Sequence, residues 1–126
     1  MQELKTRGIR GANVVQENIK ESIFKSTREV LEKIFEQNLI EIEEIAAVYF
    51  TLTPDLNAAF PAEVAREMGL TSVPLLCIQE IAVPNRLPQV VRVLMLINTN
   101  LKQSEIKHAF LGEAQKLRDD LNQEEK

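Results

Sequence analysis

The chain has too few reactive side chains for most familiar enzyme chemistries. Cys77 is its only cysteine and His108 its only histidine, so no internal disulfide can form and neither residue has the companions that a metal site needs. The sequence has no P-loop pattern, no Gly-x-Gly-x-x-Gly pattern and no Gly-x-Ser-x-Gly pattern. A Cys77–His108 nucleophilic pair is conceivable, but lone residues of these types are structural in most proteins.

Positive charge and long apolar runs are scarce as well. The 126 residues include 15 Lys plus Arg and 19 Asp plus Glu, and the net charge of −4 argues against general binding to nucleic acid or to an anionic membrane. No apolar run approaches the length of a membrane span, and the first seven residues lack the apolar region of a secretion signal. We therefore expect a cytoplasmic protein with a single domain over residues 1–121 and a frayed tail over residues 122–126.

One apolar run contains a charge near its middle. Residues 90–97 read Val-Val-Arg-Val-Leu-Met-Leu-Ile, which predicts a central strand covered on both faces. A guanidinium cannot lose its charge, and burying Arg92 unpaired would cost several kcal/mol or more. Either the strand is an edge strand whose arginine blocks unwanted pairing, or an anion meets Arg92. The run alone leaves both explanations open.

Apolar periodicity predicts an alternation of strands and helices along the chain. The expected elements are a weakly apolar strand (4–12), an amphipathic helix (18–37), a second strand (46–53), a short helix (62–68), a third strand (75–80) and a loop (82–88). Asn18 is expected to cap the long helix, with Glu21 as its capping-box partner. Because strand, helix and strand follow one another, we expect a right-handed crossover and a pair of parallel strands. For the last segment the sequence allows two alternatives, a helix capped by Ser104 or a short strand over residues 108–111.

Arginines are the most informative polar residues. Arg7, Arg10, Arg66 and Arg92 each lie in or beside a predicted strand or short helix rather than on a long solvated face. Planar donors that cannot deprotonate suit carboxylates, and the glycines between and after the first two arginines would let the backbone come close to an anion. One chain of this size would struggle to surround a ligand with all four, so a site between subunits is favoured.

An ordered set of short motifs resembles a known family. They are Arg7-Gly8-Ile9-Arg10-Gly11-Ala12, Thr53-Pro54-Asp55-Leu56, Phe60-Pro61-Ala62 with Arg66-Glu67, Val73-Pro74, Cys77-x-Gln79-Glu80, Arg92-Val93 and Leu117-Arg118 with Leu121. In this order and spacing the chain resembles the small, monofunctional chorismate mutases of the trimeric α/β class, which are distinct from the all-helical class. The resemblance spans residues 7 to 121.

The resemblance implies both a fold and a reaction. The fold would be α/β (α+β), with a mixed sheet of four or five strands covered by one long and one short helix. Three chains would form a homotrimer with a pseudo-barrel core and active sites at the subunit interfaces. The reaction would be the Claisen rearrangement of chorismate to prephenate, on the path to phenylalanine and tyrosine. It needs no cofactor, no metal and no covalent intermediate.

The resemblance also implies roles for individual residues. Arg92 would donate to the ether oxygen of the breaking bond, with the substrate as its counter-charge. Arg10 would bind a carboxylate, and Glu80 would accept a hydrogen bond from the ring hydroxyl. Further substrate-binding residues would be Arg7, Phe60, Ala62, Arg66, Leu75, Leu76, Cys77, Phe110 and Leu117. Of these, Phe60, Ala62 and Arg66 would come from the neighbouring chain.

Four positions depart from the family pattern. Glu63 stands where lysine is frequent, Phe110 where tyrosine is usual, Leu76 where threonine is common, and Asp119 where proline is usual. None of them is Arg92, Arg10 or Glu80, so we expect weaker substrate binding rather than lost activity. Two alternatives are a trimeric enzyme similar to the imine-hydrolysing deaminases and a non-catalytic binder of aromatic metabolites.

Overall fold

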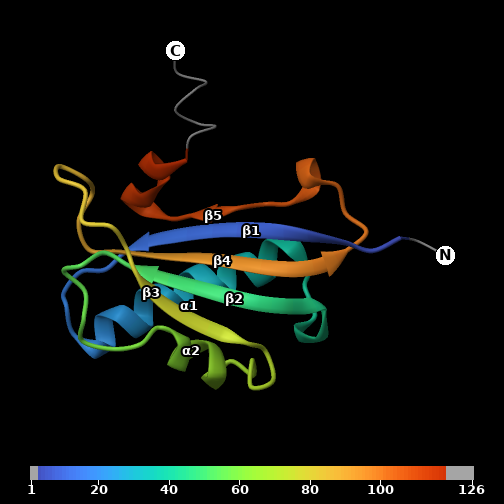
Figure 1. The fold of residues 1–126 in the computed structure, drawn as a ribbon, viewed down its shortest axis with the longest axis horizontal. Coiled ribbons are helices and arrows are strands. Elements are labelled where there is room, and N and C mark those ends of the chain that lie inside the picture. Colours follow the sequence, from blue (N-terminus) through green and yellow to red (C-terminus); the bar gives the residue numbers. More distant parts are fainter. Residues whose placement is uncertain (1–2, 119–126) are drawn as a thin grey trace, which may run out of the picture.

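The strand that contains Arg92 lies at the centre of a five-stranded mixed sheet in the computed structural model, which describes residues 3–118 (Figure 1). Strand β4 (Val90–Thr99) pairs antiparallel with β1 (Lys5–Val14) on one side and with β2 (Ile45–Leu52) on the other. Strand β3 (Leu75–Gln79) continues the sheet beyond β2, and β5 (Ala109–Phe110) continues it beyond β1, both in parallel. The edge-strand explanation for Arg92 is therefore wrong.

The crossover prediction is confirmed only in part. Strands β1 and β2 run in the same direction, since both are antiparallel to β4. They are not neighbours, however, because β4 lies between them in the order β3-β2-β4-β1-β5. The local sequence pattern correctly predicted that β1 and β2 run in the same direction. It could not predict that β4, which comes much later in the chain, pairs between them.

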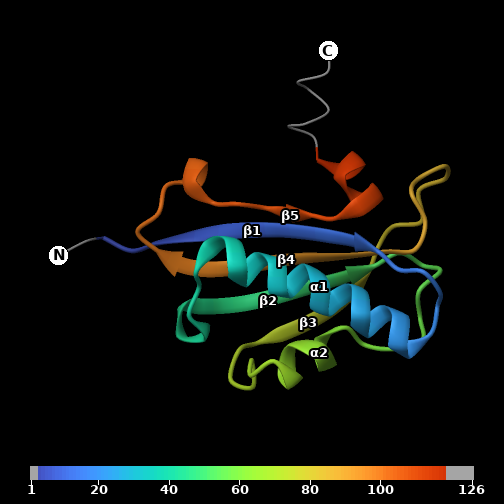
Figure 2. The ribbon, with the colours of Figure 1, turned by 180° about the vertical axis from the view of Figure 1, so that it is seen from behind.

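Two helices cover one face of the sheet, α1 (Lys20–Asn38) and α2 (Ala62–Glu67) (Figure 2). Helix α1 buries the predicted apolar residues Ile23, Val30, Leu31 and Ile34 against the strands. The predicted N-cap is wrong, because the helix begins after Ile19 and has no side-chain cap. The Asn18 side chain instead accepts the backbone N–H of Asn57 and of Ala58, at 3.0 and 3.1 Å. A tertiary contact thus takes the place of the local cap.

The opposite face of the sheet is only partly covered in the single chain. Val91, Val93, Met95 and Ile97 face the helices and are buried. On the other face Leu94, Ile78 and Leu76 are 39%, 44% and 52% exposed, so the expectation that β4 is covered on both faces does not hold for one chain. We call these three side chains, with half-buried Tyr49, the open face.

The C-terminal segment covers one end of that face. A short strand, β5, is followed by Gly112 at a φ of 53° and by a 3-10 helix, η3 (Gly112–Leu117), which confirms the strand alternative for residues 108–111. Ser104 lies in a single 3-10 turn, η2 (Gln103–Glu105), so the capped-helix alternative is wrong. Another 3-10 turn, η1 (Ile42–Glu44), precedes β2. Asp119 and the predicted frayed tail lie outside the described residues.

Gly11 has a packing role that the sequence did not indicate. A Cβ atom at Gly11 would lie 2.8 Å from Val30 Cγ2 and 3.1 Å from Ile34 Cδ1, both on α1. Real Cβ contacts are essentially never as short as 2.8 Å, so a side chain here would force Val30 and α1 to shift. Gly11 therefore permits close helix packing rather than the approach of an anion.

Residues 3–118 contain no helix of the length and apolarity needed to cross a membrane.

Candidate active site

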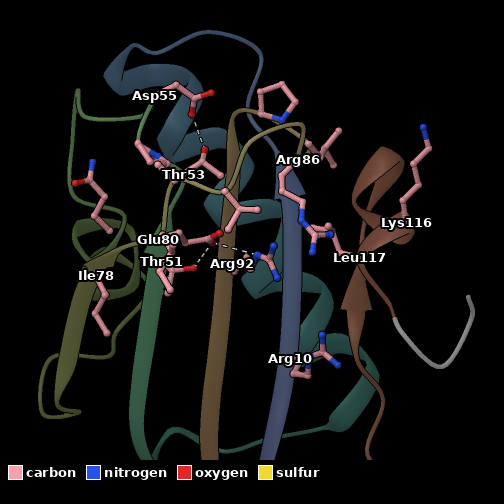
Figure 3. A pocket seen from close by; sticks show the side chains of 17 residues that line it. Arg10, Thr51, Thr53, Asp55, Ile78, Glu80, Arg86, Arg92, Lys116 and Leu117 are labelled. Atoms are coloured by element: carbon pink, nitrogen blue, oxygen red, sulfur yellow. Dashed lines mark hydrogen bonds and ion pairs between the residues drawn. The ribbon is translucent and has the colours of Figure 1, made fainter.

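Arg92 projects from the middle of the sheet into a cleft on the open-face side (Figure 3). Its direct neighbours across the strands are Ala12 on β1 and Thr51 on β2. Residues that lie opposite each other across strands project to the same face. The small Ala12 and the short Thr51 leave room for the guanidinium between them, and the Arg92 side chain remains 40% exposed.

Glu80 meets Arg92 within the same chain. Its backbone N–H donates to the carbonyl of Leu52 at 2.9 Å, which fixes the residue at the end of β3. Glu80 Oε2 lies 3.1 Å from Arg92 Nε and also accepts a hydrogen bond from the Thr51 hydroxyl. The Arg92 N–H is not aligned with that oxygen as in a good hydrogen bond, so the contact is an ion pair. Glu80 therefore supplies one counter-charge to Arg92 within the chain, and the counter-charge expected from the substrate stays a prediction.

This arrangement leaves donors and an acceptor for a ligand. The ion pair uses Arg92 Nε, whereas the guanidinium carries four of its five N–H donors on the terminal Nη atoms. Both contacts to Glu80 use Oε2, and among residues 3–118 no hydrogen bond or ion pair uses Oε1. A cationic donor and a carboxylate acceptor therefore lie side by side in the cleft.

Arg10 lies on the same face, two residues before Ala12 on β1. Its guanidinium carbon lies 5.1 Å from the centre of the Phe110 ring, and Arg118 lies over that ring at 5.8 Å. Phe110 is 7% exposed and packs with Ala12, Val90 and Ala114. Because the ring is buried and attracts cations, Phe110 acts as a fixed platform for Arg10, a role that needs no tyrosine hydroxyl.

The cleft as a whole is rich in positive charge. Its lining includes the cations Arg10, Arg86, Arg92 and Lys116, the carboxylates Asp55 and Glu80, and apolar Leu117 (Figure 3). The chain as a whole carries a net charge of −4, so this surplus is local. The cleft can therefore hold a small anion with more than one negative group.

The remaining candidate residues form a second group, beside a groove that shares only Ile78 and Gln79 with the cleft. Phe60 is 66% exposed and lines a groove on the other side of edge strand β3, with Glu63 and Cys77. Helix α2 beside this groove carries Ala62, which is buried, and Arg66, which is exposed. We call Phe60, Ala62, Glu63 and Arg66 the α2 group. The structure thus divides the expected site into two parts.

Three further candidates lie away from the cleft. Leu75 packs against the core under the helices, and Leu76 projects from the open face. Arg7 is on the helix side of β1 and donates from Nε to the carbonyl of Leu101 at 3.0 Å. Because it is three positions from Arg10, strand alternation places the two side chains on opposite faces.

Cys77 has the properties of a structural cysteine. Cys77 on β3 and His108 beside β5 are at opposite edges of the sheet, so the nucleophilic pair is wrong. Burial raises the pKa of the Cys77 thiol, and the Glu63 carboxylate acts in the same direction, whereas the Ala62 backbone N–H and Arg66 act against it. His108 Nδ1 accepts the backbone N–H of Arg10 at 2.9 Å.

The raised pKa of Cys77 predicts slow alkylation. A raised pKa means less thiolate at each pH, so iodoacetamide should modify the native thiol more slowly than the thiol of the urea-unfolded chain. The pH at which native reactivity rises should also lie higher. Mass spectrometry of timed samples measures both rates, and Glu63→Gln should move the native profile toward lower pH. Rapid labelling of native protein near neutral pH would contradict this assignment.

Comparison with known proteins identifies the family. The model of the family "Chorismate mutase type I" matches residues 6–121. The chain belongs to this family. It is 53% identical over 116 residues to chorismate mutase AroH of Thermus thermophilus, covering 91% of this chain and 95% of that protein. It is 40% identical over 117 residues to chorismate mutase AroH of Bacillus subtilis (strain 168), covering 92% of each.

A solved structure agrees with the fold of this chorismate mutase family member. The chorismate mutase from Clostridium thermocellum superposes with a TM-score of 0.84 at 42% identity, covering 86% of this chain and 96% of that one. The predicted mixed α/β sheet and the resemblance to monofunctional chorismate mutases are thereby confirmed. Membership also separates the chain from the deaminase-like alternative.

The residues of the cleft that sequence reasoning missed include Thr51 and Arg86. Thr51 supports Glu80, and Arg86 lies on the loop between β3 and β4. The sequence gives no signal for Thr51, because its position opposite Arg92 depends on the pairing of β2 with β4. Arg86 carried one signal, since it is an arginine between two prolines in the loop that leads to Arg92.

Proposed function

We propose that this protein converts chorismate to prephenate in the cleft around Arg92. The Arg92–Glu80 pair, set among further cations, is the observation that carries this proposal. Chorismate has two carboxylates, an ether oxygen and a ring hydroxyl, so it needs cationic donors and one acceptor. The cleft offers both kinds of group next to each other, and family membership supports the same reaction.

Arg92 has the central catalytic role in this proposal. The rearrangement breaks a C–O bond, and negative charge develops on the ether oxygen in the transition state. A fixed guanidinium donor stabilises that charge without reorganising, and hydrogen bonds from charged donors are roughly twice as strong as neutral ones. The Glu80 contact at Nε orients the guanidinium so that Nη faces the substrate.

Glu80 and Arg10 hold the substrate in a reactive conformation. Glu80 Oε1 accepts the ring hydroxyl, while Oε2 stays with Arg92 and Thr51. Arg10, held on Phe110, binds a carboxylate. Bringing the enolpyruvyl group over the ring supplies the near-attack geometry. A rate gain of about a millionfold needs about 8 kcal/mol, which these effects share without a nucleophile, a base or a cofactor.

We propose further that the working form is a homotrimer in which the α2 group of one chain completes the cleft of the next. The open face supports this assembly, because Leu76, Ile78 and Leu94 leave apolar surface exposed on the face of the sheet that carries the site. The exposure of Phe60 supports it too, since a large aromatic side chain beside a groove needs a partner. The cytoplasmic location stays a prediction.

Subunit mixing tests the shared site. Arg92→Ala and Arg66→Ala each damage a different part, so each variant alone should be nearly inactive. After the two are co-refolded in equal amounts, about a quarter of the sites should contain both intact parts, with activity restored to match. As a control, Arg92→Ala mixed with Glu80→Gln should restore nothing, because both changes lie in the same cleft. Absence of recovery in the first mixture would overturn the shared site.

Formation of prephenate from chorismate tests the reaction itself. Purified protein should accelerate the loss of chorismate absorbance, with prephenate as the product. Release of ammonia from 2-iminoacids without effect on chorismate would favour the deaminase-like alternative. Thermal stabilisation by prephenate without turnover would favour the binder.

A further inference from the structure

Arg86 is a cleft residue to which the family resemblance gives no role. It lies in the loop that joins β3 to β4 and lines the same cleft as Arg10, Glu80 and Arg92. Figure 3 shows its side chain directed from the loop over β1, the strand that carries Arg10, toward Leu117. Its position puts a guanidinium at the mouth of the cleft.

The folded chain leaves the charge of Arg86 unmatched. Arg28 pairs with Glu67 and Arg92 with Glu80, whereas Arg86 has no ion pair or hydrogen bond to another residue within 3–118. The cleft carboxylates are already engaged. Asp55 accepts the backbone N–H of Gln89 at 3.0 and 3.2 Å, and Glu80 holds Arg92. An incoming anion is therefore the natural partner of Arg86.

The loop that carries Arg86 is fixed at both ends. At its start the Glu80 N–H donates to the carbonyl of Leu52 at 2.9 Å. At its end the Val90 N–H donates to Thr53 Oγ1 at 2.9 Å, and the Gln89 carbonyl accepts the N–H of Val15 at 2.7 Å. A guanidinium on a loop with fixed ends binds a ligand at lower entropic cost than one on a free loop.

Two residues near Arg86 have left-handed backbone conformations. Asn85, immediately before it, has a φ of 64°, and Gln89, three residues after it, has a φ of 52°. The left-handed region is tolerated by asparagine but disfavoured for glutamine. Asp55 offsets that disfavoured conformation by binding the Gln89 amide with both oxygens. The turn therefore sets the direction in which Arg86 leaves the backbone.

We propose that Arg86 binds one carboxylate of the substrate, as a partner to Arg10 at the other. This inference rests on the proposed function and adds a specificity-determining residue to it. Arg92 is balanced by Glu80, so Arg10 and Arg86 provide one cation for each of the two substrate carboxylates. The reaction does not change the charge of either carboxylate, so Arg86 binds substrate and transition state equally. Its loss raises KM and leaves kcat nearly unchanged.

The test compares Arg86→Ala with Arg28→Ala in the chorismate assay. Both variants remove one positive charge, but Arg28 lies on α1, outside the cleft, and its side chain is 42% exposed. Arg86→Ala should raise KM about tenfold with kcat within about twofold of wild type. Arg28→Ala should change neither constant. Arg86→Lys should recover part of the loss, and the effect of Arg86→Ala should shrink as ionic strength rises.

Two results would overturn the assignment, and they are distinguishable from failure of the proposed function. Equal KM values for Arg86→Ala and Arg28→Ala, with wild-type protein fully active, would remove Arg86 from the substrate site. A fall in kcat equal to the fall in kcat/KM would show a role other than uniform binding. Wild-type protein without any turnover would instead overturn the proposed function, and this inference with it. Thermal melting of each variant establishes that it is folded.

Discussion

Replacing Arg92 by alanine is expected to lower kcat for chorismate by about a thousandfold or more. Loss of one neutral donor from an oxyanion site costs about a hundredfold to a thousandfold, and Arg92 is a charged donor. The change also leaves Glu80, whose side chain is only 18% exposed, without its cation. Initial rates over a range of chorismate concentrations measure the effect on kcat and KM separately.

Arg92→Lys is the informative control. It keeps the positive charge but loses the planar fork that lets one atom face Glu80 while others face the substrate. We expect most of the activity to be lost here too, although less than with alanine. If Arg92→Ala kept more than about a tenth of the wild-type rate, Arg92 could not be the group that stabilises the breaking bond. Circular dichroism and thermal melting separate this loss from unfolding.

Replacing Glu80 by glutamine is expected to lower kcat about a hundredfold. Glutamine keeps the shape of the side chain and one carbonyl acceptor, but it removes the negative charge. That charge orients Arg92 and strengthens the hydrogen bond from the ring hydroxyl. Without that carboxylate the cleft is more positive, so a dianionic substrate should bind as well as before or better. We therefore expect kcat to fall while KM is unchanged or lower.

The hydroxyl of Thr51 offers a graded version of the same test. Thr51→Val removes one hydrogen bond to Glu80 Oε2 at nearly constant volume and should lower kcat about tenfold. Thr51→Ser keeps the hydroxyl and should stay close to wild type. A rise in KM with unchanged kcat for Glu80→Gln would contradict the orienting role, because it would assign Glu80 to substrate binding alone.

Local patterning predicted the strands and helices because each depends on neighbouring residues. The apolar run of β4 and the spacing on α1 required no information about the rest of the chain. A charge within an apolar strand also indicated that Arg92 needs a counter-charge, and Glu80 supplies one within the chain, whereas the anion site stays a prediction. That inference is physical, since a guanidinium at the centre of a sheet needs a counter-charge.

Pairing between distant strands could not be predicted in the same way. Glu80 and Thr51 reach Arg92 only because β2 lies between β3 and β4 in a particular register. The opposite orientation of Arg7 and Arg10, by contrast, follows from strand alternation and was visible in the sequence. The predicted Asn18 cap was wrong for the same reason. Asn18 binds Asn57 and Ala58, which are about forty positions away and could not be predicted as its partners from the local sequence.

The absorbance of chorismate in the presence of purified wild-type protein tests the central claim most directly. We predict that kcat exceeds the uncatalysed first-order rate constant by about a millionfold, that prephenate accumulates in equal amount, and that no cofactor is required. The Arg92→Ala protein, prepared in the same way, should show almost none of this acceleration. Disappearance of chorismate at the uncatalysed rate with folded wild-type protein would contradict the account.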